Sequence, residues 1–235
     1  MFKFISPSNV YILIQKLIKF INSIFFLFLV VGLTFALVLS PPDYIQGDTV
    51  RIMYVHVPSA WLGLACFSFI TILSIFNFIF KIKNFYFINK SIAPIGLLFT
   101  CLAIVTGSLW GQPTWGTWWA WDARLTSMLV LMLFYVFYIL VLKLIKNEQL
   151  LIKISSIVAI VGSINLPIIK YSVEWWSTLH QPASIKITGS STIHSTMLLP
   201  LLAMLFVFLL YAALIFLMKY KTEIIRIKKK NIKRI

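Results

Sequence analysis

Charged residues are scarce in this 235-residue sequence. Only 11% of its residues are Asp, Glu, Lys or Arg, whereas soluble domains carry about a quarter. Hydrophobic residues make up 60% of the chain, and the mean hydropathy is +0.95. The composition excludes a soluble domain and predicts an integral membrane protein, with residues 1–235 forming one polytopic domain.

Cysteine is also rare, and the positions of the two cysteines exclude thiol–disulfide chemistry. Cys66 and Cys101 each lie inside an apolar run, and no CxxC or CxxCH motif occurs. Thiol exchange needs an accessible pair of cysteines, so we expect two small core residues instead. A glycine-rich phosphate-binding loop is absent too, which predicts no ATPase within this chain.

Six long apolar runs dominate what is present. Each run can supply the roughly 20 residues that a membrane-spanning helix needs, and continuous runs of this length favour helices over a closed barrel. We expect an all-α protein with spans at about 20–39, 57–80, 92–109, 125–142, 150–169 and 193–218. The first run is long enough to span and ends in SPPDY, so we expect an uncleaved helix rather than a signal peptide.

Positive charge is distributed unequally between the two sides of this arrangement. Of the 21 Lys and Arg residues, 17 fall in the N-terminal segment, the second and fourth connections and the C-terminal tail. The positive-inside rule therefore predicts six spans with both termini in the cytoplasm. Because the basic residues flank apolar runs, we interpret the net charge of +15 as a topology signal and lipid contact, with no nucleic-acid partner.

All eight tryptophans fall on the opposite, outer side. Five of them occur in the first twelve positions of residues 110–124, WGQPTWGTWWAWDAR, which we call the Trp-rich segment. An aromatic belt forms at both membrane faces, so it accounts for Trp61 but not for the whole set. If the segment is helical after Pro113, one interfacial face carries Trp115, Trp118, Trp119 and Asp122. Such a row of indoles suits a large planar apolar ligand.

The three histidines, His56, His180 and His194, lie on the same outer side. Two imidazoles facing each other across a planar ring can ligate haem iron, whereas three histidines could bind zinc. Zinc needs no indoles, and no carboxylate or thiolate has ligand spacing with these histidines. We therefore expect haem, with His56 and His180 as axial ligands because each lies near a Trp cluster. Arg124 and Arg51 are the candidate partners of the haem propionates, although lipid headgroups suit Arg51 equally.

Three stretches carry a resemblance to a known family. WGTWWAWDAR resembles the WWD signature of the haem-handling membrane proteins of cytochrome c biogenesis, and RIMYVHVPSAW and WWSTLHQPASI flank it as they do in the CcmC family. The resemblance runs from about Pro41 to Leu217. The WGTWW form, six spans and the length resemble CcmC, haem exporter protein C, rather than its larger relatives.

This resemblance implies a haem-handling protein of the bacterial inner membrane, not an enzyme. It implies a site on the periplasmic face, in which two histidines matching His56 and His180 ligate haem. The WWD segment would supply the haem platform, formed by Trp115, Trp118, Trp119, Trp121 and Asp122. Arg124 would orient the loop or a propionate, and His194 matches no family ligand. The implied recipient of haem is the periplasmic chaperone CcmE, and the implied complex contains the ABC transporter pair CcmA and CcmB with the small membrane protein CcmD.

Three alternatives remain open from the residues. The chain could be a component of a larger WWD-type haem lyase, although its loops are short for apocytochrome recognition. It could be an electron-transfer subunit with permanently bound bis-His haem, although no histidine lies in the predicted membrane interior. A scaffold that only recruits the ABC transporter would leave the Trp and His excess unexplained.

Overall fold

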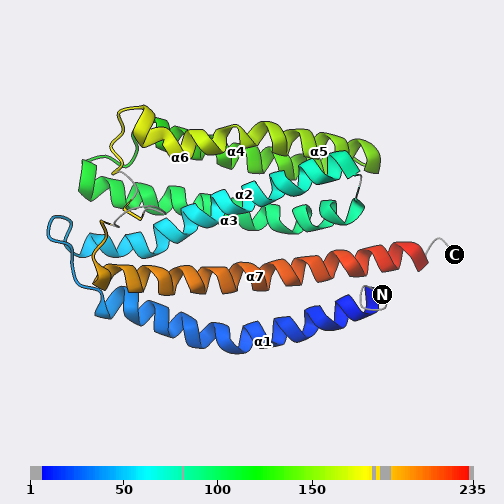
Figure 1. Cartoon of the computed structure of the whole chain (residues 1–235), viewed down its shortest axis with the longest axis horizontal. Helices are drawn as coiled ribbons and strands as arrows, with labels where there is room; N and C mark the ends of the chain where they lie inside the picture. The colour runs from blue at the N-terminus through cyan, green and yellow to red at the C-terminus, as the bar shows by residue number, and fades with distance from the viewer. Residues whose placement is uncertain (1–6, 81, 182–183, 186–191, 233–235) are drawn as a thin grey trace.

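The protein is all-helical in a computed structural model that describes residues 7–80, 82–181, 184–185 and 192–232. Its long helices are α1 (Pro7–Thr34), α2 (Met53–Phe80), α3 (Lys83–Trp115), α4 (Ala123–Leu144), α5 (Glu148–Ser163), α6 (Asn165–Trp175) and α7 (Ser195–Ile232). A π-helical turn, η2 (Phe35–Leu39), continues α1, and a 3-10 turn, η3 (Asp48–Ile52), leads into α2. Figure 1 shows the helices running side by side along the longest axis.

The six predicted spans are confirmed as helices that are long and apolar enough to cross a membrane. The helices extend beyond the predicted limits: α3 continues to Trp115 and α7 to Ile232. Pro7 at the start of α1 and Ile232 at the end of α7 lie at the same end of the bundle (Figure 1), as an even number of spans requires.

The fifth span differs from the prediction because it consists of two helices. α5 ends at Ser163 and α6 begins at Asn165. Pro167 has no backbone N–H for the carbonyl four residues earlier, at Ser163, and its ring crowds that carbonyl. The Asn165 side chain lies beside this break and donates a hydrogen bond of 2.8 Å to the carbonyl oxygen of Ser127 in α4. The second half of the span is thereby attached to α4.

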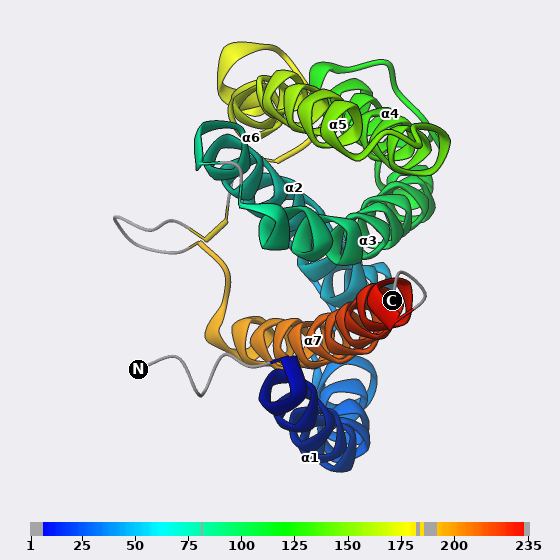
Figure 2. The ribbon, with the colours of Figure 1, turned by 90° about the vertical axis from the view of Figure 1, so that its right-hand side faces the viewer.

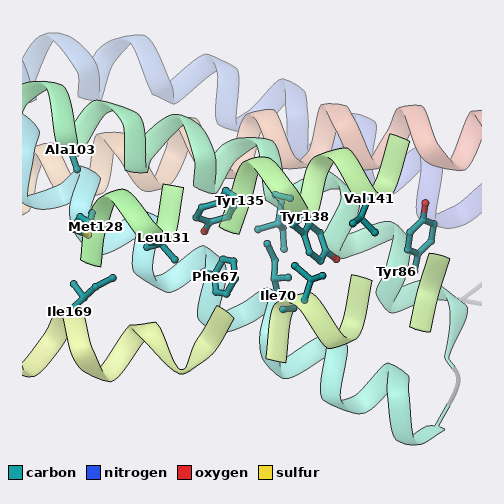
Figure 3. Close-up of a cluster of buried hydrophobic side chains, with 14 of the residues drawn as sticks. Phe67, Ile70, Tyr86, Ala103, Met128, Leu131, Tyr135, Tyr138, Val141 and Ile169 are labelled. Atoms are coloured by element: carbon teal, nitrogen blue, oxygen red, sulfur yellow. The ribbon is translucent and has the colours of Figure 1, made fainter. Parts of the chain in front are cut away.

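The main hydrophobic core lies between α2, α3, α4 and the α5–α6 pair. Phe67, Ile70, Tyr135 and Tyr138 are nearly inaccessible and meet in its centre (Figure 3). The Tyr135 hydroxyl donates a hydrogen bond of 2.7 Å to the carbonyl oxygen of Gly63, which connects α4 to α2. Such buried polar contacts satisfy groups for which lipid offers no partner.

The first and last helices form a separate pair. α1 packs along α7, and α7 in turn packs against α2 and α3 (Figure 2). Large apolar side chains of α1 are exposed over most of its length, among them Phe20, Phe26 and Leu27. A lipid environment would cover this surface.

The end of the bundle opposite the start of α1 and the end of α7 carries the connections and helix ends in which the Trp and His residues lie (Figure 1). The first of these connections is folded against α3. Asp43 accepts hydrogen bonds of 2.9 Å from the backbone N–H groups of Ile45 and Gln46. The Gln46 side-chain oxygen then accepts a hydrogen bond of 2.9 Å from the indole N–H of Trp110. We call this the aromatic end of the molecule.

Candidate functional site

His56 is held in the first turns of α2 against the last third of α3. Its Nδ1 lies 2.9 Å from the carbonyl oxygen of Ala103 and 3.2 Å from the Thr106 hydroxyl oxygen. A carbonyl oxygen can only accept, so Nδ1 carries the proton and donates to Ala103. The neutral ring then has its lone pair on Nε2. Fixing one nitrogen in this way is how proteins orient a ligating imidazole.

One face of α3 forms the seat for the His56 ring. It consists of Ala103, Thr106, Gly107 and Trp110, which follow the i, i+3, i+4, i+7 pattern of a helix face. A Cβ atom at Gly107 would lie only 2.9 Å from Cε1 of His56. The Trp110 ring meets the imidazole edge to face, with centroids 5.7 Å apart. The sequence prediction did not include this face. The small residues at 103 and 107, followed by Trp110, were the available signal.

His180 is positioned differently, in the non-helical connection after α6. Its ring meets Trp115, the last residue of α3, with centroids 4.7 Å apart. Its Nδ1 lies 3.6 Å from Oδ2 of Asp122, which exceeds a hydrogen-bond distance. The predicted histidines therefore both contact tryptophans of the last turns of α3.

The pKa of His180 is lowered to about 4, first by burial and then by the positive charge of Arg124, which outweigh the opposing effect of Asp122. A charge on His56 would lower it further, so the two imidazoles lie within electrostatic range of each other. At neutral pH the His180 ring is uncharged, and a neutral imidazole is the form that ligates a metal.

Asp122 connects the elements around His180. Its Oδ1 accepts a hydrogen bond of 2.8 Å from the backbone N–H of Leu125 and so caps the N-terminus of α4. Its Oδ2 accepts a hydrogen bond of 3.3 Å from the backbone N–H of Leu179, the residue before His180. One carboxylate thus joins the start of α4 to the His180 connection.

The predicted helical face of the Trp-rich segment is wrong. α3 ends at Trp115, and Gly116 terminates it with a left-handed backbone at φ +74°. The Thr117 hydroxyl then donates a hydrogen bond of 3.0 Å to the carbonyl oxygen of Trp119, and residues 116–122 form a non-helical connection. The proposed i, i+3, i+4, i+7 register is therefore lost, and the indoles are arranged by a folded loop instead.

Within this loop the tryptophans have unequal environments. Trp118 and Trp121 are 58% and 78% exposed, whereas Trp119 is half-buried and meets Trp121 edge to face at 5.6 Å. Trp118 and Trp121 are therefore the exposed indoles of the Trp-rich segment. They give the aromatic end an open apolar surface beside Trp115 and His180.

The remaining tryptophans lie outside this arrangement. Trp61 packs against the buried cluster of Ala36, Tyr54, Leu201 and Met204, which is a structural role. Trp175 and Trp176, at the end of α6, meet each other at 5.7 Å, and Trp175 stacks on Tyr171 at 5.3 Å.

The two arginines that we expected as partners of the haem propionates have different surroundings. Arg51 lies 3.2 Å from Asp48 within η3 and is 31% exposed, so a carboxylate already offsets its charge. Arg124 lies in the first turn of α4 and is half-buried, and its charge acts on His180. Of the two, Arg124 is the cation associated with the histidines.

His194 is exposed, and its Nδ1 lies 2.8 Å from the Thr196 hydroxyl at the start of α7. Within the described parts of the chain, no three His, Cys, Asp or Glu side chains are grouped to hold a metal ion.

Several polar atoms at this end fit a bound ligand. Among the described residues, buried nitrogens without a hydrogen-bond partner include His180 Nδ1 and Trp119 Nε1. Buried polar atoms are normally satisfied, so unpaired ones commonly mark a site that another group completes. A planar metal-bearing macrocycle with acidic groups would match the imidazoles, the indoles and Arg124.

These features define a class: a multi-pass membrane protein with two half-buried imidazoles and a folded Trp-rich loop at one end of its bundle. The model of the family CcmC, haem exporter protein C, matches residues 1–234. The chain belongs to this family, a group of haem export proteins of cytochrome c biogenesis rather than enzymes.

The chain is similar to curated proteins over most of its length. It is 38% identical over 221 residues to haem exporter protein C of Bradyrhizobium diazoefficiens, covering 94% of this chain and 84% of that one. It is 37% identical over 220 residues to haem exporter protein C of Haemophilus influenzae, covering 94% and 89%. A ccmC-like mitochondrial protein of cytochrome c biosynthesis from Marchantia polymorpha is 39% identical over 178 residues, covering 76% of this chain and 72% of that protein.

Proposed function

We propose that this protein binds haem b at the periplasmic face of the bacterial inner membrane and delivers it to the chaperone CcmE. The observation that carries the proposal is the placement of two imidazoles, His56 and His180, beside the last turns of a single helix, α3. Haem is the cargo in this account and is not retained.

His56 and His180 would supply the axial nitrogens. The Nδ1–H of His56 donates to Ala103, which leaves Nε2 to face the iron. His180 is neutral at physiological pH because burial lowers its pKa to about 4, so no proton competes with the metal for its lone pair. Bis-imidazole ligation supplies the binding free energy that an open, weakly charged face does not.

The Trp-rich loop would form the haem platform, with Trp115, Trp118, Trp119 and Trp121 providing apolar area for the macrocycle. Arg124 provides a cation for a propionate. Asp122 fixes the loop, because it caps α4 and holds the backbone next to His180. The exposure of Trp118 and Trp121 leaves a surface at which a recipient can reach the edge of the haem.

An open site favours transfer over permanent binding. A haem used for electron transfer is usually enclosed between helices, whereas His180 lies in a connection between α6 and α7. The distribution of Lys and Arg supports the orientation in which the aromatic end faces the periplasm. We infer that CcmA and CcmB supply the ATPase that the sequence of this chain lacks, and that CcmD completes the complex.

The test is the loading of purified CcmE by the reconstituted protein. A His56→Ala/His180→Ala double variant should fold but load CcmE only at background level. Trp118→Ala/Trp119→Ala should also reduce loading. Trp175→Ala/Trp176→Ala removes two tryptophans at the end of α6, outside the Trp-rich segment, and should load normally. Normal loading of CcmE by the folded histidine variant would refute the proposal. Equal losses of loading in the two Trp variants would refute the assignment of the Trp-rich loop as the haem platform.

A further inference from the structure

A second feature lies at the end of the bundle away from the histidines. There α3 packs against both α4 and α7, and a cavity of about 300 Å³ opens between the three helices. Figure 2 is the view onto this end, with α3, α4 and α7 labelled. No step of the proposed haem transfer uses this cavity.

The rim of the cavity is strongly basic. Lys90, Lys143, Lys219 and Arg226 line it, and Glu223 is the single carboxylate among the described lining residues. Glu223 is buried and is held on both sides: its oxygens lie 2.9 Å from Nζ of Lys90 and 2.8 Å from Arg226. The basic side chains therefore exceed the acidic ones by three, and Glu223 holds two of the four cations, Lys90 and Arg226, in place.

The inner wall of the cavity is apolar. Pro94 of α3 and Ile139 and Leu142 of α4 form it. Pro94 follows Lys90 by four residues toward the membrane centre, and Ile139 precedes Lys143 by four residues in the same direction. Ser91 and Thr222 also line the cavity, and their hydroxyl groups already donate hydrogen bonds of 2.9 Å to the carbonyl oxygens of Phe87 and Met218. A basic polar rim above an apolar wall matches a molecule with an anionic head and a hydrocarbon body.

We propose that this cavity binds the headgroup of an anionic phospholipid, such as phosphatidylglycerol. The phosphate would be held at the rim by Lys143 and Lys219, and the first part of an acyl chain would follow the wall of Pro94, Ile139 and Leu142. Basic pockets between membrane helices on the cytoplasmic side have this recognition chemistry, and the anionic lipids of that leaflet are an available source.

The chain should show the lipid preference directly in native mass spectrometry. The full-length protein in detergent is titrated with phosphatidylglycerol and, separately, with phosphatidylcholine. We expect one phosphatidylglycerol to bind with about tenfold or greater preference, because each basic residue near a headgroup contributes about a factor of five.

Lys143→Gln/Lys219→Gln should remove most of this preference while leaving the Glu223 ion pairs intact. Both lysines are exposed, so the variant should keep its melting temperature in phosphatidylcholine. The matched control is Lys146→Gln/Lys153→Gln, which removes the same charge from exposed positions at the same end that do not line the cavity. This control should bind phosphatidylglycerol as the unaltered chain does.

A third arm distinguishes a lipid from a free anion. Inorganic phosphate at millimolar concentration should not displace phosphatidylglycerol, because it cannot use the apolar wall. Displacement by phosphate would overturn the lipid assignment. Equal losses of the phosphatidylglycerol preference in the two double variants would show that the lipid responds to the overall positive charge of this end and not to the cavity. The absence of any such preference in the unaltered chain would also refute the proposal.

Discussion

His56 and His180 reach the same end of the molecule by different structural routes. His56 lies on a helix, its ring is packed against a face of α3, and its Nδ1 donates to a backbone carbonyl. His180 lies in a connection, and the nearest acceptor to its Nδ1 is the Asp122 carboxylate, 3.6 Å away. The His56 ring is thus held by a direct hydrogen bond to a backbone carbonyl, whereas Nδ1 of His180 has no hydrogen-bond partner among the described residues.

This difference suits the proposed release of haem to a recipient. A rigid imidazole can hold one axial position throughout, while a ligand on a connection can withdraw as a recipient approaches. Because Asp122 also caps α4 and holds the Leu179 backbone, movement of His180 would involve the Trp-rich loop as well. Five substitutions test this distinction, in order of decreasing expected effect.

The largest effect should come from removing either imidazole. His56→Ala and His180→Ala should each lower haem affinity by at least about a hundredfold, the upper range seen even for groups that only support a ligand. Their stabilities should differ: His56→Ala removes a packed ring and should cost about 1–3 kcal/mol, whereas His180→Ala should cost less. Haem titration and thermal unfolding measure the two quantities, and equal destabilisation would contradict the contrast.

Asp122→Asn should have the next largest effect. An asparagine still caps α4, but it removes the carboxylate that faces His180, so haem affinity should fall by about tenfold or more. The measurement is haem titration, with thermal unfolding to show that the cap is retained. An unchanged affinity would mean that Asp122 has only the capping role.

Gly107→Ala tests the seat of His56 without altering any polar group. The added Cβ would approach Cε1 of His56 to 2.9 Å, so the ring must shift. A cost of about 1 kcal/mol at this contact would weaken haem binding by about fivefold. Val105→Ala, at an exposed position on the same helix, is the control and should bind haem normally. If Gly107→Ala also binds haem normally, close packing of the His56 ring on α3 is not required for haem binding.

The smallest effect is expected for Thr106→Val. The Thr106 hydroxyl lies 3.2 Å from Nδ1 of His56, but the Ala103 carbonyl oxygen remains as the closer acceptor at 2.9 Å. Loss of the hydroxyl should therefore reduce haem affinity by less than about threefold. A loss as large as that of Asp122→Asn would show that His56 depends on a side chain too, and would remove the distinction between the two histidines.

The helices could be predicted well from the sequence because a continuous apolar run of this length is typical of a membrane-spanning helix. The prediction missed the break at Ser163–Asn165, although Pro167 was visible, because hydropathy does not change there. In the Trp-rich segment the helix continued two residues past Pro113 and then stopped. Gly116 and the capping residue Asp122 indicated this helix end locally. The prediction instead followed the spacing of the tryptophans, which matched a helix face.

The candidate site could be predicted only in part, because some of the groups that form it have no distinctive side chain. His56, His180, Asp122 and Arg124 are chemically conspicuous, so a reading of the sequence selects them. The Ala103 carbonyl oxygen is a backbone atom, and Gly107 has no side chain, so neither has a chemical signature in the sequence. Their contribution arises only when α2 packs on α3.

The most direct test of the account is the absorption spectrum of the purified protein with haem, compared with those of His56→Ala and His180→Ala. The account predicts a low-spin bis-imidazole spectrum that each single substitution converts to a high-spin form. A protein that binds no haem, or a spectrum that neither substitution changes, would contradict the histidine pair as the centre of the site.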